Sequence, residues 1–244
     1  MLMTKVNFNK RILVSITGRT EKEWQDKLNE INNLKGLDGK KITEIVLFLE
    51  IFGKEQREKI YQALLQSPIK SIPLVHIRHD MDKSELQFLK KNFKTKYFTI
   101  HEINFQHNDI LKWKGFYKQL CLEMNYDNFV SGKVKVKNID GFCVDLAHFK
   151  AGMERLNKDF GYVYNRKDII KYFDCNHLNG YNPDTQKDMH TIYNLKDFDY
   201  LRNLPNFVFG KIIALETFNS IKEQLKFKKY LTKLLNNKFL PAGR

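Results

Sequence analysis

Cysteine and long apolar runs are both scarce in this chain of 244 residues. The three cysteines, Cys121, Cys143 and Cys175, are scattered, odd in number and form no C-x-x-C pair. This usage argues against a disulfide framework and predicts buried, free thiols. No segment approaches the roughly 18 uninterrupted apolar residues of a membrane span, and residues 1–5 lack the apolar core of a signal peptide. The sequence therefore predicts a cytoplasmic protein with no membrane partner.

Acidic residues are also few, because 28 Asp and Glu stand against 42 Lys and Arg, which gives a formal net charge of +14. The hydrophobic share of 42% excludes a disordered chain. Excess positive charge favours an anionic partner such as a nucleic acid. Lysine greatly outnumbers arginine, however, and asparagine is abundant, as an AT-rich genome would produce. A solvated basic surface without a partner is therefore the alternative.

Short apolar, β-rich runs alternate with longer segments of helical period. Strands are expected at residues 11–16, 44–50, 73–77, 97–101, 119–123, 141–145, 172–177 and 209–216. Helices are expected at residues 21–34, 54–65, 84–93, 148–159 and 220–235, while the connections 102–118 and 125–140 show little helical pattern. No linker interrupts this alternation, so the sequence predicts an α/β fold, a single (β/α)8 TIM barrel domain over residues 1–244. A doubly wound open sheet is the competing interpretation.

Potential metal ligands stand at the ends of six consecutive predicted strands, from the third to the eighth. In chain order they are His76, His101, Glu123, Asp145, His177 and Glu216. A barrel carries its chemistry at the C-terminal ends of its strands. We therefore expect these six side chains to meet at one barrel mouth.

Three further candidates follow the sixth and seventh strands. His148 lies three residues after Asp145. Asp188 and His190 form a D-x-H segment in the loop after the seventh predicted strand. Each residue alone has a structural explanation, such as a packed histidine or a helix-capping carboxylate. The joint pattern takes in five of the seven histidines. It predicts a divalent-metal site, since imidazoles suit Zn²⁺ or Mn²⁺ and carboxylates can bridge two ions.

At these residues the chain resembles the xylose isomerase-like TIM barrel superfamily. The resemblance is closest to the endonuclease IV-type AP (apurinic/apyrimidinic) endonucleases, AP endonuclease family 2, and covers roughly residues 70–220. Residues 142–152 are similar to the family segment D-x-x-H-x-x-x-x-G, with the glycine one place early. The other similar segments are Leu122-Glu123 (L-E-N), His177-Leu178-Asn179 (H-x-N-D), Asp188-Met189-His190 (D-x-H) and Leu215-Glu216-Thr217 (L-E-T).

The resemblance implies a centre of up to three zinc ions. The first ion would be held by His76, His101 and Glu123. The second would share Glu123 and be completed by Asp145, His177 and Glu216. The third would be held by His148, Asp188 and His190. The implied reaction is hydrolysis of a phosphodiester 5′ to an abasic site in DNA, by hydroxide that the ions generate.

The chain departs from the family in the loops beside these ligands. Gly180-Tyr181 stand where the family has Asp-Ser after its H-x-N segment. Met124 follows Glu123 in place of asparagine, and residues 192–195 carry no glycine after the D-x-H segment. All nine ligand positions nevertheless have a candidate.

Two other functions are compatible with the same barrel. In a sugar or sugar phosphate isomerase or epimerase, one Mn, Mg or Co ion would be held by Glu123, Asp145, His177 and Glu216. Glu123 and Glu216 would then act as the catalytic acid/base pair, and His148 would bind the sugar. That reaction has no use for the remaining ligand candidates, so their presence favours the multinuclear hydrolase. The other alternative is a catalytically degenerate barrel that acts as a binding module.

Overall fold

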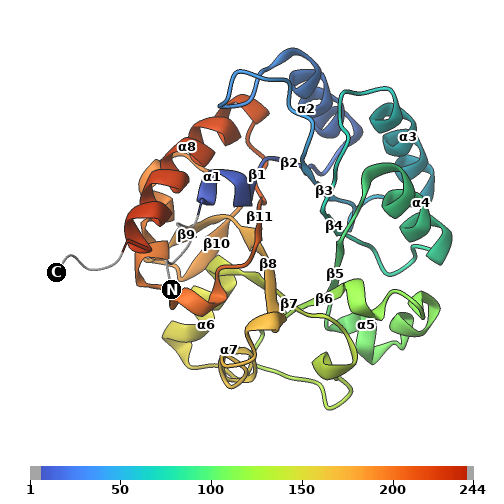
Figure 1. Ribbon diagram of the computed structural model, residues 1–244. Coiled ribbons are helices and arrows are strands. Elements are labelled where there is room, and N and C mark those ends of the chain that lie inside the picture. Colours follow the sequence, from blue (N-terminus) through green and yellow to red (C-terminus); the bar gives the residue numbers. More distant parts are fainter. Residues whose placement is uncertain (1–6, 241–244) are drawn as a thin grey trace, which may run out of the picture.

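The computed structural model describes residues 7–240, and the signal-peptide prediction for residues 1–5 lies outside them. A ring of parallel strands is surrounded by helices (Figure 1). The strand order is β1-β11-β8-β7-β6-β5-β4-β3-β2. β1 (Ile12–Leu13) pairs with β11, whereas β2 (Ser15–Ile16) pairs with β3. Because β1 and β2 belong to one segment, that segment joins both ends of the sheet. The barrel prediction is confirmed, and the open sheet is excluded.

With β1 and β2 counted as one strand, eight parallel strands lie where the sequence predicts them. Their continuous apolar runs suit parallel strands that are covered on both faces. The others are β3 (Val46–Phe48), β4 (Leu74–His76), β5 (Tyr97–His101), β6 (Leu120–Glu123), β7 (Gly141–Asp145), β8 (Phe173–Leu178) and β11 (Ile212–Leu215).

The helices cover the outside of the ring, and several begin at a side-chain cap. Thr20 accepts a hydrogen bond from the Glu23 N–H at the start of α2, and Ser220 does the same for Glu223 in α8. The α-helices are α1 (Phe8–Arg11), α2 (Glu21–Asn33), α3 (Lys54–Leu65), α4 (Lys83–Phe93), α5 (Ile103–Gln106), α6 (Leu146–Arg155), α7 (Lys158–Tyr164) and α8 (Ile221–Lys238). Short 3₁₀ segments at 109–113, 117–119, 136–138, 170–172, 195–203 and 206–208 complete the connections.

The single helix predicted over residues 148–159 is wrong, because the chain forms two helices there. Asp145 caps α6, which therefore begins before His148. Leu156 then adopts a left-handed conformation with φ 52°, which ends α6. Asn157 accepts a hydrogen bond from the Phe160 N–H and starts α7. Local capping thus overrides the apolar periodicity of the segment.

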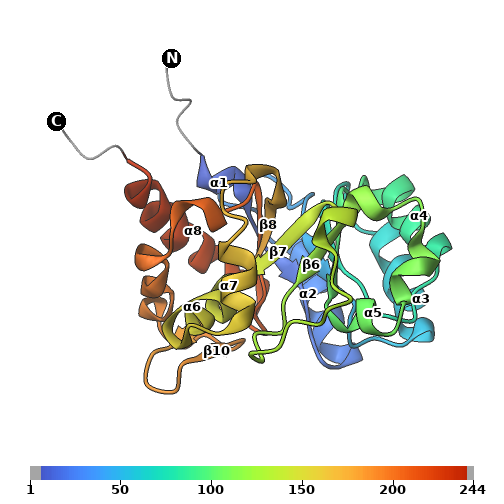
Figure 2. The ribbon, with the colours of Figure 1, turned by 90° about the horizontal axis from the view of Figure 1, so that it is seen from below.

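A short antiparallel hairpin, β9 (Gly180–Asn182) with β10 (Lys187–Met189), follows β8 where the sequence predicts a loop. The Asn182 side chain accepts hydrogen bonds from two N–H groups of the turn. Figure 2 shows this hairpin and α1 at opposite ends of the barrel. Because the hairpin follows the C-terminal end of β8, it marks the mouth at which the candidate ligands stand.

The interior of the barrel is a separate apolar cluster of strand residues that includes all three cysteines. Its members are Leu13, Val46, Phe48, Leu74, Cys121, Cys143, Cys175, Ile212 and Ala214. The cysteines are buried and unpaired, which confirms the prediction of free thiols. Between residues 7 and 240, the structure contains no helix with the length and apolar character needed to cross a membrane.

Lys27 on α2 is a buried cation beside the mouth, only 3% exposed. Its Nζ donates a hydrogen bond of 2.7 Å to the carbonyl oxygen of Thr217, the residue after Glu216. Burial lowers the pKa of Lys27 to about 7, although Glu23 and Glu30 act in the opposite direction. Between this pKa and the unfolded value near 10.4, the unfolded chain binds the extra proton. The free energy of unfolding therefore rises with pH in that window.

Replacing Lys27 with methionine is expected to stabilise the protein most at pH 6, because the folded chain no longer has to bury a charged amine. The gain in the free energy of unfolding is at most about 5 kcal/mol, and loss of the hydrogen bond to Thr217 reduces it. The gain should shrink steadily between pH 7 and pH 10. Urea unfolding at several pH values measures this trend. Lys22→Met is the control, since Lys22 lies on the same helix with 81% of its side chain exposed. A gain that does not change with pH would contradict the assigned pKa.

Candidate metal centre

The nine predicted ligands lie at the mouth of the barrel. His76, His101, Glu123 and Asp145 are the last residues of β4, β5, β6 and β7. The other five are His177 in β8, His148 in α6, Asp188 in β10, His190 just after β10 and Glu216 just after β11. The structure sorts them into two neighbouring groups.

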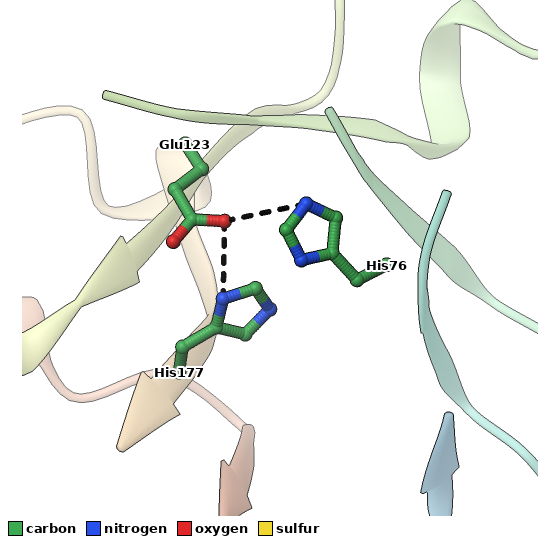
Figure 3. A group of neighbouring side chains, drawn as sticks. All are labelled: His76, Glu123 and His177. Carbon is green, nitrogen blue, oxygen red and sulfur yellow. Dashed lines mark ion pairs between the residues drawn. The ribbon is translucent and has the colours of Figure 1, made fainter. Parts of the chain in front are cut away.

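The first group, called the central group, has Glu123 in its middle. Its members are His76, Glu123, Asp145, His177 and Glu216. The Oε2 atom of Glu123 lies 3.1 Å from Nδ1 of His177 and 3.7 Å from Nε2 of His76 (Figure 3). Glu216 also approaches His177, with 3.5 Å between its Oε2 and Nδ1. One oxygen or nitrogen from each of Glu123, Asp145, His177 and Glu216 falls within 4.8 Å of all the others. Such spacing allows these atoms to share one cation.

Asp145 is held in place by two hydrogen bonds. Its Oδ1 accepts the His148 N–H at 2.8 Å, as the cap of α6, and its Oδ2 accepts the Asn179 side-chain amide at 2.9 Å. The D-x-x-H and H-x-N segments are thereby joined, since Asn179 lies two residues after His177. Donors that fix a carboxylate in this way orient it as a metal ligand.

His148, Asp188 and His190 form the second group, which is named here the outer triad. Asp188 lies between the two imidazoles, with its Oδ1 3.2 Å from Nε2 of His148 and its Oδ2 2.9 Å from Nε2 of His190. These contacts hold the pKa of Asp188 well below its usual range. Burial lowers the pKa of both histidines, but the nearby carboxylates raise it to about 10 for His148 and about 9 for His190.

His101 lies beside the central group but outside its closest set. Its ring centroid is 4.7 Å from that of His76. Its Nδ1 is buried without a hydrogen-bond partner. The structure thus brings His101 to the same mouth, next to the two residues with which it is expected to bind an ion.

Glu50 is a member of the centre that the sequence interpretation missed. It follows β3 directly, and its Oε2 lies 3.6 Å from Nδ1 of His76. Glu50, His76 and Glu216 form a further set of atoms within 4.8 Å of one another. His76 therefore has a carboxylate on each side of its ring, Glu50 and Glu123. The signal in the sequence was a glutamate at the end of the second predicted strand.

Burial has opposite effects on the acids and bases of the centre. It raises the pKa of Glu50 to about 7 and that of Glu216 well above its usual range, and it lowers the pKa of His76. Burial also acts to raise the pKa of Glu123, but the imidazoles around it hold this pKa below its usual range. The imidazoles therefore stabilise the negative charge of the buried Glu123 carboxylate.

Buried polar atoms without hydrogen bonds show, apart from the family resemblance, that these side chains fit a divalent ion. Buried polar atoms normally have hydrogen-bond partners. Within residues 7–240, the buried atoms of this mouth that form no well-aligned hydrogen bond include Glu50 Oε2, His76 Nδ1 and Nε2, His101 Nδ1, Glu123 Oε2, His148 Nδ1, His177 Nδ1, Asn179 Oδ1 and Glu216 Oε2. Apart from the Asn179 amide oxygen, these are imidazole nitrogen or carboxylate oxygen atoms, the donor set that zinc and manganese take.

Comparison with protein-family models gives no match for this chain, and comparison with curated proteins gives none either. The residues of the mouth and their geometry are therefore the basis on which a function can be assigned.

Proposed function

We propose that this protein is a metal-dependent phosphodiesterase that binds more than one divalent cation, with zinc as the expected ion. The proposal is carried by the central group and the outer triad lying side by side. Asp145 belongs to the central group, and its Oδ2 is 3.9 Å from Nδ1 of His148 in the triad. Adjacent ion sites suit in-line displacement at phosphorus, because the attacking and leaving oxygens can each be stabilised.

Each part of the mouth has a defined task in this proposal. Glu123 would share a cation with His76 and His177, because its Oε2 faces these two imidazoles from different strands. Asp145 and Asn179 couple the central group to the outer triad. Bound divalent ions would supply water activation and charge stabilisation at the phosphoryl group. Glu123, Glu216 and His148 are the residues proposed to act in catalysis.

The proposed substrate is DNA that contains an abasic site. Its support is the resemblance of the ligand segments to the endonuclease IV-type enzymes together with the net charge of +14. Neutralising four phosphates would weaken binding about 100-fold between roughly 50 and 200 mM salt. Fluorescence anisotropy with a labelled abasic duplex measures this slope. A flat salt response would argue against a nucleic acid and for a small substrate.

Metal content is the test of the central proposal. The protein is purified without chelators or a histidine tag and analysed by elemental mass spectrometry. We expect about two to three zinc ions per chain and cleavage of an abasic duplex that stops when the metal is removed. A protein that takes up no ion after zinc or manganese supplementation would overturn the proposal and favour the binding module.

Replacing His190 with alanine is expected to remove one ion per chain and leave the central group loaded. The reason is that Asp188 would lose one of its two imidazole neighbours, so the outer triad would lose a ligand. Elemental mass spectrometry of variant and wild type measures the difference. His107→Ala is the matched control, since His107 is exposed and belongs to neither group. An unchanged ion count would show that the outer triad is not a metal site.

A single-metal sugar isomerase or epimerase is the second candidate, and one observation favours it. Glu123, Asp145, His177 and Glu216 alone form a compact four-residue set. In that reaction Glu123 and Glu216 would exchange a proton with the carbon beside a carbonyl. One manganese, magnesium or cobalt ion per chain, with no change on removing His190, would support this candidate.

A further inference from the structure

The three cysteines form a layer directly beneath the central group. Each lies two residues before a proposed ligand on its own strand: Cys121 before Glu123, Cys143 before Asp145 and Cys175 before His177. Residues two apart on a strand face the same side. The thiols accordingly belong to the cluster that fills the barrel interior. Barrel interiors are usually filled by branched aliphatic side chains, so a layer of thiols at this depth is a distinct chemical feature.

The three thiols belong to one packed cluster inside the barrel. The Cys175 thiol donates to the carbonyl oxygen of Phe142, the residue before Cys143, at 3.8 Å. Cys143 and Cys175 are also register partners on the neighbouring strands β7 and β8. Cys121, by contrast, is the register partner of Gly141.

The register partners have the separation that a disulfide requires. Neighbouring strands lie about 4.8 Å apart, and disulfides join residues whose Cα atoms are about 4.4–6.8 Å apart. Both side chains point into the barrel, as their membership of the interior cluster shows. A bond between Cys143 and Cys175 therefore needs rotation of both side chains and a small approach of the strands, because a disulfide holds its Cβ atoms about 3.5–4.5 Å apart.

We propose that Cys143 and Cys175 are a reversible oxidation site that controls the metal centre. Hydrogen peroxide is the oxidant: the two S–H bonds break, one S–S bond forms, and the two electrons and two protons convert peroxide to two molecules of water. The S–S bond links the strands directly below Asp145 and His177, which are themselves register partners. Metal affinity then falls.

The test begins with metal-free, reduced protein and does not require the proposed function for its first step. Folded protein is treated with hydrogen peroxide, and free thiols are counted after denaturation. We expect the count to fall from three to one per chain, with Cys143 and Cys175 in one disulfide-linked peptide on mass spectrometry. Three remaining thiols, or a linkage that includes Cys121, would overturn the assignment.

The second step measures zinc binding by calorimetry before oxidation, after it and after dithiothreitol. We expect at least about a tenfold loss of affinity on oxidation, comparable to the loss of a supporting contact to a ligand, with full recovery on reduction. Equal affinities would overturn the control of the metal centre, and failure of the reduced protein to bind zinc would instead overturn the proposed function.

Two variants make the assignment specific. Cys175→Ala should prevent the disulfide and leave zinc binding insensitive to peroxide, whereas Cys121→Ala should keep both effects. If Cys175→Ala does not fold, Cys143→Ala takes its place, since it removes the other half of the disulfide and should have the same effects. Sensitivity to peroxide in both Cys143→Ala and Cys175→Ala would contradict the proposal.

Discussion

Replacing Glu123 with glutamine is expected to abolish metal-dependent hydrolysis and to lower metal affinity by more than about 100-fold. Glutamine preserves the shape but removes the charge that faces His76 and His177 from one oxygen. Residues that merely support a ligand cost about 10- to 100-fold in metal affinity when mutated. A bridging ligand should therefore cost more. Metal titration by calorimetry and a cleavage assay under saturating metal measure the two effects separately.

The fold of this variant should be unchanged. The substitution removes a buried charge without leaving a cavity, so the metal-free protein should keep its circular dichroism spectrum and cooperative unfolding. Glu44→Gln provides the control, because Glu44 is exposed and stands at the start of the second predicted strand, at the end away from the mouth. Activity above about a tenth of wild type would exclude Glu123 as a bridging ligand.

The strands were the most predictable part of the fold. Parallel strands buried on both faces are continuous apolar runs, and such runs stand out between amphipathic helices. β5 and β7 have the predicted bounds. The predicted run 209–216 was too long, because Phe209 is also buried although it precedes β11. Burial alone therefore does not fix where a strand begins.

The site residues that stand at the ends of strands could be predicted from the sequence. Placing acidic and imidazole side chains at the ends of consecutive strands required only the barrel rule. Glu50 obeys the same rule, yet the family resemblance begins near residue 70, so this glutamate carried no motif. The hairpin that presents Asp188 was also missed, although Asn182-Pro183-Asp184 is a turn signal and the Asn182 side chain accepts the hydrogen bonds of that turn.

Arg57 shows why some stabilising residues escape a sequence interpretation. A single arginine in an amphipathic helix indicates a solvated face, but Arg57 is fully buried. Its Nε and Nη2 donate to the two oxygens of Glu85 on α4, each at 2.8 Å. Its Nη1 donates to the carbonyl oxygen of Phe52 and to Asp80. The pattern of charges along the chain contains no signal for this pairing.

Replacing Arg57 with methionine is expected to lower the free energy of unfolding by about 3–5 kcal/mol, the usual cost of leaving one partner of a buried ion pair uncompensated. Burial acts to raise the pKa of Glu85, and Arg57 and Tyr61 hold it below its usual range. Without Arg57 this carboxylate must either stay charged with fewer donors or take up a proton. Urea unfolding at pH 7 measures the loss, and a change below about 1 kcal/mol would contradict the assigned role.

The double variant Arg57→Met, Glu85→Leu separates the ion pair from the packing of the helices. Removing both charges should restore much of the lost stability, because the unpaired carboxylate is the main penalty. The double variant should still bind metal less tightly than wild type. Arg57 holds the Phe52 carbonyl and Asp80, which lie in the loops after β3 and β4 beside Glu50 and His76. Restored stability with reduced metal affinity would show that this buried arginine orders the mouth in addition to stabilising the fold, whereas full recovery of both would limit it to stability.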